Sequence, residues 1–133
     1  MTNILFICKF NRFRSKVAEA YFKKINKNPK NQAKSAGLIV GTALNRHQKA
    51  RAREFGIKLT GRPKPLTAEL LVWADFFVIV ADNVPPSIFD PKNYNTPVIV
   101  WKIRDAHSRD ISDVRRAITE IIVKVEDLVE ELK

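Results

Sequence analysis

The stretch Ile4–Ser15, ILFICKFNRFRS, joins an unbroken apolar run to a short cationic segment. The run from Asn3 to Ile7 is apolar after its first residue and bounded by polar residues, which predicts a short buried strand. From Ser15 onward apolar residues recur with helical spacing, so we expect a helix that Ser15 caps at its N-terminus. Cys8, the only cysteine of the chain, therefore lies where a buried strand passes through a loop into a helix.

The rest of the chain alternates between short apolar runs and amphipathic segments. The further expected strands are Ala33–Ala36, Asp75–Ala81 and Pro97–Trp101. The further expected helices are Leu44–Phe55, ended by Gly56, a short one from its cap Thr67 to Trp73, and a C-terminal one capped by Asp110. A loop with one helical turn is expected from Asn83 to Asn95. The C-terminal helix should bury one face, made of Ile111, Val114, Ile118, Ile121, Ile122, Val125, Leu128, Val129 and Leu132.

This order of elements predicts an α/β fold. Continuous apolar strands that alternate with helices are typical of a parallel sheet covered on both faces. We therefore expect one domain over residues 1–133, with three α/β/α layers around a parallel sheet of about four strands. Ligands of such sheets bind beyond the carboxyl ends of the strands, and Cys8 lies at that end of the first strand.

The composition limits the class of protein. The chain has 133 residues and 45% hydrophobic residues, enough for one domain with a core. No apolar run approaches the roughly 18 residues of a membrane span, and the N-terminus does not read as a signal peptide. One cysteine forms neither an internal disulfide nor a cysteine zinc site. We therefore expect a cytoplasmic protein that does not bind membranes.

The charge is unevenly distributed along the chain. Residues 1–64 carry 16 Lys and Arg against two acidic residues, a net charge of +14, whereas residues 65–133 carry a net charge of −4. A basic half attracts phosphates, nucleic acid or acidic protein surfaces. Within it, Arg46 to Arg53 is interpreted as the solvated face of a helix whose apolar positions are Leu44, Ala50 and Phe55.

The loop between the first strand and its helix has the composition of an anion site. Backbone N–H groups in a tight loop and the helix N-terminus attract negative charge, and Arg14 adds a planar, two-pronged donor. Asn11 tolerates the left-handed conformation that such a loop can require. Positive surroundings and a helix start favour the thiolate form of a cysteine, so we expect Cys8 to act as a nucleophile that Ser15 steadies by a hydrogen bond.

With these residues the sequence resembles the low-molecular-weight protein tyrosine phosphatases. Their signature is an apolar strand, a cysteine, five residues and Arg-Ser, with Gly-Asn inside the loop and an Ala-Glu-Ala-like helix after it. The resemblance covers nearly the whole chain. It rests on Cys8, Asn11, Arg14, Ser15 and Ala18–Ala20, and then on Ser35–Gly37, Arg62–Thr67 and Trp101–Asp105.

The resemblance implies hydrolysis of a phosphotyrosine-containing protein or a small aryl phosphate, with inorganic phosphate as product. Cys8 would attack phosphorus and form a phosphocysteine, while Arg14 and loop N–H groups hold the phosphoryl oxygens. Asp105 would protonate the leaving oxygen and then activate water. No metal or cofactor is needed. The implied substrate-binding residues are Lys9, Phe10, Asn11, Arg12, Phe13, Arg14 and Ser15, and the rim that selects the substrate is expected at Val40–Arg46 and Asp105–Arg109.

The sequence departs from the family pattern at four positions. Phe10 replaces the loop glycine, and it either strains a positive φ or narrows and walls the anion site. Phe13 stands where many members have a second cysteine, so no protective disulfide with Cys8 can form. Lys16 replaces a proline in the first helical turn. Ala106 replaces the proline of the Asp-Pro motif, which leaves the segment of the acid less rigid.

Two alternatives to a phosphatase stay open. Arsenate fits the same oxyanion site, but a reductase with one cysteine would need an external small thiol. The second alternative is a non-catalytic phosphate- or nucleic-acid-binding module on the same fold, which the +14 half favours. Turnover that depends on Cys8 distinguishes the phosphatase from the binding module.

Overall fold

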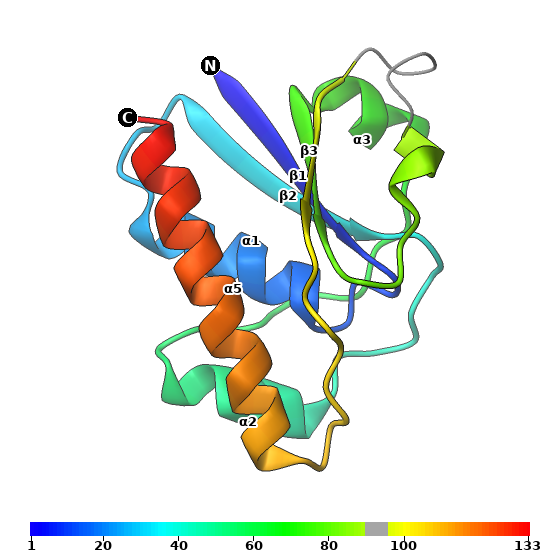
Figure 1. The fold of residues 1–133 in the computed structure, drawn as a ribbon, viewed down its shortest axis with the longest axis vertical. Helices are drawn as coiled ribbons and strands as arrows, with labels where there is room; N and C mark the ends of the chain where they lie inside the picture. The colour runs from blue at the N-terminus through cyan, green and yellow to red at the C-terminus, as the bar shows by residue number, and fades with distance from the viewer. Residues whose placement is uncertain (90–95) are drawn as a thin grey trace.

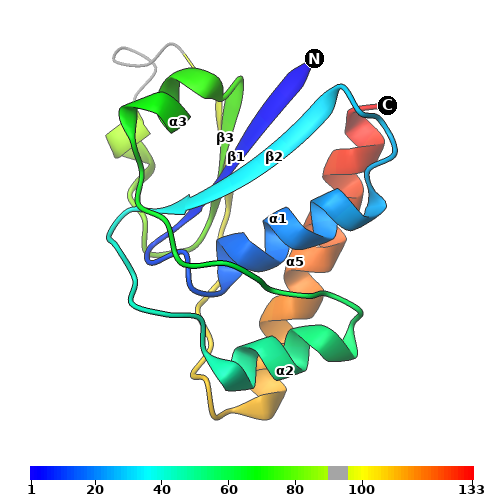
Figure 2. The same cartoon turned by 180° about the vertical axis from the view of Figure 1, so that it is seen from behind.

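The central sheet lies between two layers of helices, as the computed structural model shows for residues 1–89 and 96–133, the part of the chain that it describes (Figures 1 and 2). In these residues the sheet has four strands in the order β2-β1-β3-β4, and all neighbours pair in parallel. The strands are β1 (Thr2–Cys8), β2 (Asn31–Gly37), β3 (Phe76–Val80) and β4 (Val98–Trp101). The helices are α1 (Arg14–Ile25), α2 (Arg46–Glu54), α3 (Ala68–Trp73) and α5 (Ile111–Glu131), with the 3₁₀ turn η1 (Pro86–Phe89). The predicted three-layer α/β/α fold is confirmed.

Both faces of the sheet are buried, which explains why its inner strands are apolar throughout. On one face Ile4 and Phe6 of β1 pack with residues of α1 and α5. On the other face Leu5 and Ile7 pack into a second cluster that includes residues flanking α3 and η1. Figure 1 shows α3 on one side of the sheet and α1 and α5 on the other. Because successive side chains of a strand point to opposite faces, a strand that is covered on both faces needs an apolar residue at every position.

Most predicted helix ends are confirmed. Thr67 caps α3 by accepting a hydrogen bond from the Leu70 N–H (3.2 Å), and Asp110 caps α5 by accepting from the Asp113 N–H (3.0 Å). Gly56 follows α2 with a φ of 73°, a left-handed conformation that suits glycine at a helix end. The helical turn expected between Asn83 and Asn95 is η1, and residues 90–95 of that predicted loop lie outside the described residues.

Four details of the sequence prediction are wrong. Ser15 does not cap α1, because the helix already begins at Arg14 and the Ser15 hydroxyl is used inside the loop. Helix α2 begins at Arg46, after the cap Asn45, and it buries Gln48 and Ala52 rather than Ala50. Ile111 is 46% exposed because it lies in the first turn of α5, before the helix reaches the core.

Among the described residues, no helix is long and apolar enough to cross a membrane.

Helix α5 supplies a large part of the core, so its buried face should dominate stability. Ile121 is fully buried, whereas Val123, two residues further along the same helix, is 50% exposed. We expect Ile121→Ala to lower the free energy of unfolding by about 2–5 kcal/mol through lost burial and a residual cavity. Val123→Ala should change it by no more than about 0.5 kcal/mol. Urea denaturation measures both, and equal losses would contradict this assignment of the core face.

Candidate active site

The loop of residues 9–13 connects β1 to α1 and is held against the end of β2. The N–H groups of Leu38 and Ile39 donate to the carbonyls of Cys8 (3.0 Å) and Lys9 (2.8 Å). Gly37 allows this close approach, since a Cβ there would lie 2.6 Å from the Phe10 carbonyl carbon. Hydrogen bonds from the two residues that follow β2 and close packing against Gly37 therefore both fix the backbone of the loop.

The side chain of Asn11 forms hydrogen bonds that hold this loop to its neighbours. This side chain is fully buried, and its Nδ2 donates to the hydroxyls of Ser15 (2.7 Å) and Ser35 (2.9 Å). Its Oδ1 accepts from the Lys64 N–H (2.9 Å), and the Ser35 hydroxyl in turn donates to Glu19. With a φ of 55°, Asn11 is the only non-glycine residue with a positive φ among residues 1–89 and 96–133. This agrees with the left-handed tolerance expected of Asn at this position.

Replacing Asn11 should separate backbone strain from lost hydrogen bonds. We expect Asn11→Ala to lower the free energy of unfolding by about 2–4 kcal/mol, because it strains the backbone and leaves buried polar groups without a partner. Asn11→Gly should cost about 1 kcal/mol less, since glycine adopts a positive φ without strain. Chemical denaturation of the two variants measures the difference. An alanine variant as stable as the glycine variant would argue against strain at this residue.

Cys8 lies at the carboxyl end of β1 with its side chain against the first turn of α1. It is 2% exposed, and its Sγ lies 2.9 Å from the Ser15 hydroxyl oxygen. Either group can donate in this contact, but when the sulfur is a thiolate only the Ser15 hydroxyl has a proton to donate. The structure thus places a hydrogen-bond donor beside the sulfur, as the sequence analysis expected.

Arg14 is buried at the start of α1 and is oriented by the ends of the neighbouring strands. Its Nη1 donates to the Ile103 carbonyl (2.9 Å), and its Nη2 donates to the Asn83 side chain (3.0 Å). Two carboxylates balance its charge: Oδ1 of Asp82 lies 3.5 Å from Nη1, and Oδ1 of Asp105 lies 3.7 Å from Nε. The guanidinium plane is therefore fixed before any anion binds.

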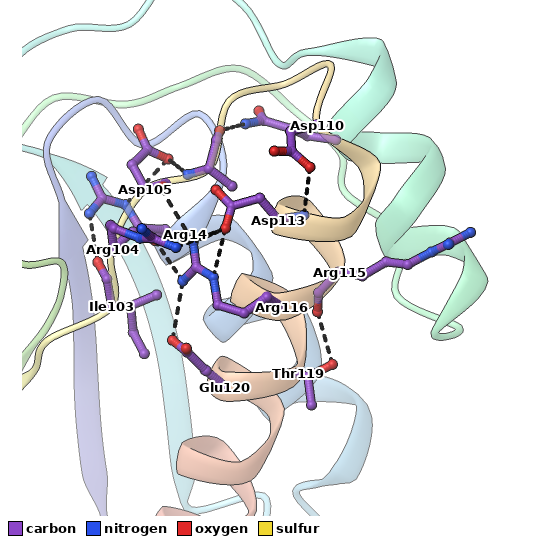
Figure 3. A network of polar contacts seen from close by, with 12 residues as sticks. Arg14, Ile103, Arg104, Asp105, Asp110, Asp113, Arg115, Arg116, Thr119 and Glu120 are labelled. Atoms are coloured by element: carbon purple, nitrogen blue, oxygen red, sulfur yellow. Dashed lines mark hydrogen bonds and ion pairs between the residues drawn. The ribbon is translucent and has the colours of Figure 1, made fainter.

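Asp105 lies on the segment after β4, with its side chain half exposed and directed toward Arg14 (Figure 3). Its Oδ1 accepts a hydrogen bond from the Ala106 N–H (2.9 Å). Arg116 of α5 holds this segment from below, because its guanidinium donates to the carbonyls of Arg104 (3.1 Å) and Asp105 (3.4 Å). Gln48 of α2 also donates to the Ala106 carbonyl (3.3 Å). These contacts restrain the segment although it lacks the proline of the family motif.

A cavity of about 170 Å³ brings the predicted residues together at this edge of the sheet. Cys8, Arg14 and Asp105 all line it. Of the other predicted binding residues, Phe10, Arg12 and Phe13 line it, whereas Lys9, Asn11 and Ser15 do not. Ala106 and Ser108 line it from the predicted rim segment after β4, and Asn45 from the other predicted rim segment; Gln48 joins them from α2.

The two phenylalanines of the loop have different surroundings. Phe10 has no positive φ, so the strain considered from the sequence does not arise, and its half-buried ring forms part of the cavity wall. The Lys9 ammonium lies 5.3 Å from the centre of the Phe10 ring. Phe13 is 3% exposed and belongs to the core beneath α1. A cysteine at this position, as in many members of the family, would fill less of the core. Cys8 and Phe10 both line the cavity of about 170 Å³, so the Phe10 ring does not fill it.

Sequence reasoning missed three contributors to the site. Gln48 was missed because the apolar residues Leu44, Ala50 and Phe55 predicted a different buried face for this helix. Asp82 and Asn83 follow β3, so the rule that ligands bind beyond the carboxyl ends of strands could have found them. Among residues 1–89 and 96–133, no three His, Cys, Asp or Glu side chains are placed to hold a metal ion.

A cysteine and an Arg-Ser pair stand on either side of a five-residue loop, at the carboxyl end of a parallel strand, and these are the features on which the resemblance in the sequence rests. A model of the family described as low molecular weight phosphotyrosine protein phosphatase matches residues 3–133. The chain belongs to this family, and the resemblance noted in the sequence is confirmed. No curated protein sequence matches the chain.

Solved structures of related fold carry different activities in their names. An arginine phosphatase from Geobacillus stearothermophilus is 24% identical with a TM-score of 0.85, covering 99% of this chain and 93% of that one. A low molecular weight protein tyrosine phosphatase from T. tengcongensis is 22% identical with a TM-score of 0.83, covering 98% and 99%. An arsenate reductase from Archaeoglobus fulgidus is 27% identical with a TM-score of 0.76, covering 96% and 98%. The fold is therefore shared by proteins whose names give different activities.

Proposed function

We propose that this protein hydrolyses phosphotyrosine or other aryl phosphate monoesters through a phosphocysteine intermediate. The observation that carries this proposal is that Cys8, Arg14 and Asp105 line one cavity. Family membership supports a phosphorylated substrate, and the choice of an aryl ester rests on the cavity itself. The Phe10 ring in the wall is an apolar surface on which a tyrosine ring can pack.

The first chemical step forms a bond between the Cys8 sulfur and phosphorus and breaks the bond from phosphorus to the aryl oxygen. Arg14 and the loop N–H groups hold the equatorial oxygens and stabilise the charge that develops on them. Asp105, which reaches the cavity from the segment after β4, enters this step protonated and gives its proton to the leaving phenolate oxygen.

The second step hydrolyses the intermediate. Asp105 now takes a proton from a water molecule, which attacks phosphorus and breaks the bond to sulfur. The Ser15 hydroxyl, 2.9 Å from the sulfur, donates a hydrogen bond to the thiolate as it leaves. Inorganic phosphate is released, and neither a metal nor a cofactor takes part. Because the nucleophile is a thiol, the proposal places the protein in a reducing compartment such as the cytoplasm.

A substrate panel tests this proposal. We expect kcat/KM to be at least about 100-fold higher for a phosphotyrosine peptide than for a phosphoserine peptide, because a phenol with a pKa of about 10 is a far better leaving group than an alcohol. The panel also includes a phosphoarginine peptide. This peptide should be a poorer substrate than the phosphotyrosine peptide, since its guanidinium would be repelled by Arg12 in the cavity wall. A higher kcat/KM for phosphoarginine would overturn the aryl assignment.

Arsenate reduction is the second candidate, favoured by the similarity to the Archaeoglobus fulgidus protein. This chain has one cysteine, so reduction would require an external thiol to resolve the arsenylated sulfur. Assay with arsenate and glutathione therefore belongs in the same panel. Thiol-dependent formation of arsenite, without hydrolysis of the phosphotyrosine peptide, would favour the reductase.

If Asp105 is the acid, Arg116 is a positioning residue for it. We expect Arg116→Met to lower kcat on a phosphotyrosine peptide by about tenfold, because the acid segment loses two of its restraints. The loss should be smaller with p-nitrophenyl phosphate, whose leaving group needs little protonation. Arg115→Met is the matched control, since Arg115 pairs with Glu54 instead. Equal losses for both substrates would indicate a merely structural role.

A further inference from the structure

A second cavity, of about 390 Å³, lies beside α1 and shares no lining residue with the cavity of Cys8. The segment between α2 and α3 passes over α1 (Figure 2), and residues of both line the cavity. Its polar lining consists of four lysines, one carboxylate and a threonine: Lys16, Lys23, Lys58, Lys64, Glu19 and Thr60. We call this the lysine cavity.

Lys16 is the unusual member of this set. The residue is 6% exposed, and within residues 1–89 and 96–133 its ammonium makes one hydrogen bond, a long one from Nζ to the Thr60 carbonyl at 3.4 Å. An ammonium has three protons to donate, and the cavity is the open side of this group.

The one carboxylate of the lysine cavity is already engaged. One oxygen of Glu19 accepts from Lys23 Nζ at 2.7 Å, and the other accepts from the Ser35 hydroxyl. The four lysines and Glu19 together leave a net charge of +3 around the cavity. Burial lowers the pKa of Lys16; Glu19 opposes this shift, while Lys64 and Lys23 add to it. The cluster therefore holds cations that repel one another, and a bound anion would relieve that repulsion.

We propose that the lysine cavity binds a diphosphate or longer polyphosphate group, free or as part of a nucleotide. Four lysines from α1 and the facing segment supply the point charges that bind phosphate oxygens. The cavity is more than twice as large as the one at Cys8, which suits a ligand with more than one phosphate group. The site does not depend on phosphatase activity, since Cys8, Arg14 and Asp105 take no part in it.

The lysine cavity also borders the network behind the Cys8 loop. The Lys64 N–H donates to Asn11, and Glu19 accepts from the Ser35 hydroxyl that Asn11 also binds. A ligand at Cys8 can therefore disturb the Lys64 amide, whereas Thr60 and Gly61 are better reporters of the cavity.

Titration of ¹⁵N-labelled protein with inorganic pyrophosphate at constant ionic strength tests the proposal by NMR. We expect the amides of Thr60 and Gly61 to shift with one saturable Kd. Lys58→Gln combined with Lys64→Gln should weaken that Kd at least about tenfold, because two charged contacts are lost. Both lysines are exposed, so the fold should survive. The matched control is Lys102→Gln combined with Lys124→Gln, which changes the net charge equally and should alter the Kd by less than about twofold.

Lys16→Met, which keeps a long apolar stem, should also weaken binding at least about tenfold. Repeating the titration with ADP distinguishes the source of the phosphate groups: a tighter Kd than for pyrophosphate indicates a nucleotide, and an equal one indicates recognition of phosphate alone. Shifts confined to residues 9–13 would overturn the proposal. So would equal Kd values in the Lys58/Lys64 and Lys102/Lys124 variants, because the ion would then bind without a defined site. If residues 9–13 stay silent, the phosphatase proposal is weakened and the test of the lysine cavity still stands.

Discussion

Cys8→Ser is expected to lower kcat on a phosphotyrosine peptide and on p-nitrophenyl phosphate by at least about four orders of magnitude. A serine hydroxyl is not ionised near pH 7 and is a poor leaving group in the second step, so both bond changes at phosphorus fail. The geometry gives this variant a clean interpretation, because Oγ would replace a sulfur that is 2% exposed and contacts the Ser15 hydroxyl. Steady-state assay of purified protein measures the loss.

Phosphate binding is the control for this variant. The loop N–H groups and Arg14 are unchanged, so Cys8→Ser should still bind inorganic phosphate and unfold at a similar urea concentration. Retained turnover in a correctly folded Cys8→Ser protein would exclude Cys8 as the nucleophile. If the wild-type protein binds phosphate but has no turnover to lose, the non-catalytic binding module becomes the better description.

Asp105→Asn is expected to produce a loss that depends on the leaving group. We expect kcat on a phosphotyrosine peptide to fall by about 10²–10⁴, the usual contribution of a positioned general acid. For p-nitrophenyl phosphate the fall in kcat/KM, which reports the first step alone, should be much smaller than for the peptide, because p-nitrophenolate leaves without a proton. Asparagine keeps the size of the side chain and the acceptor for the Ala106 N–H.

Asp82→Asn is the matched control for Asp105→Asn. Both carboxyl groups lie near Arg14, at 3.5 Å and 3.7 Å, so both substitutions replace one carboxyl group beside the same guanidinium. Of these two aspartates, Asp105 lines the cavity of Cys8 and Asp82 does not. Asp82→Asn should therefore leave the ratio of the kcat/KM values for the two substrates unchanged. A similar change of that ratio in both variants would assign the effect to the charge of Arg14 and not to proton transfer.

The fold was predictable from the chain because its local patterns agree with one another. The inner strands are apolar throughout, which requires two covered faces, and Thr67 and Asp110 cap the helices where expected. Helix α2 was harder to predict, since its few apolar residues did not define a face. The structure buries Gln48 there, where its amide contacts the Ala106 carbonyl.

The candidate site was predictable where it is local in sequence and less so where it is not. The loop from Cys8 to Ser15 is one continuous stretch, so spacing alone placed its sulfur and guanidinium together. The partners of Arg14 come from the ends of β3 and β4, and no local pattern states that Asn83 or Ile103 will meet it. The role of Arg116 depends on packing between α5 and the segment after β4, which only the tertiary structure reveals.

The central claim is that the Cys8 sulfur attacks phosphorus in a cavity that it shares with Arg14 and Asp105. Trapping the intermediate tests this claim most directly. Asp105→Asn protein is mixed with p-nitrophenyl phosphate, quenched with acid within the first turnover, digested and analysed by mass spectrometry. The account predicts one phosphoryl group on the peptide that contains Cys8, formed at the rate at which p-nitrophenolate is released. Release of p-nitrophenolate without phosphorylation of that peptide would contradict it.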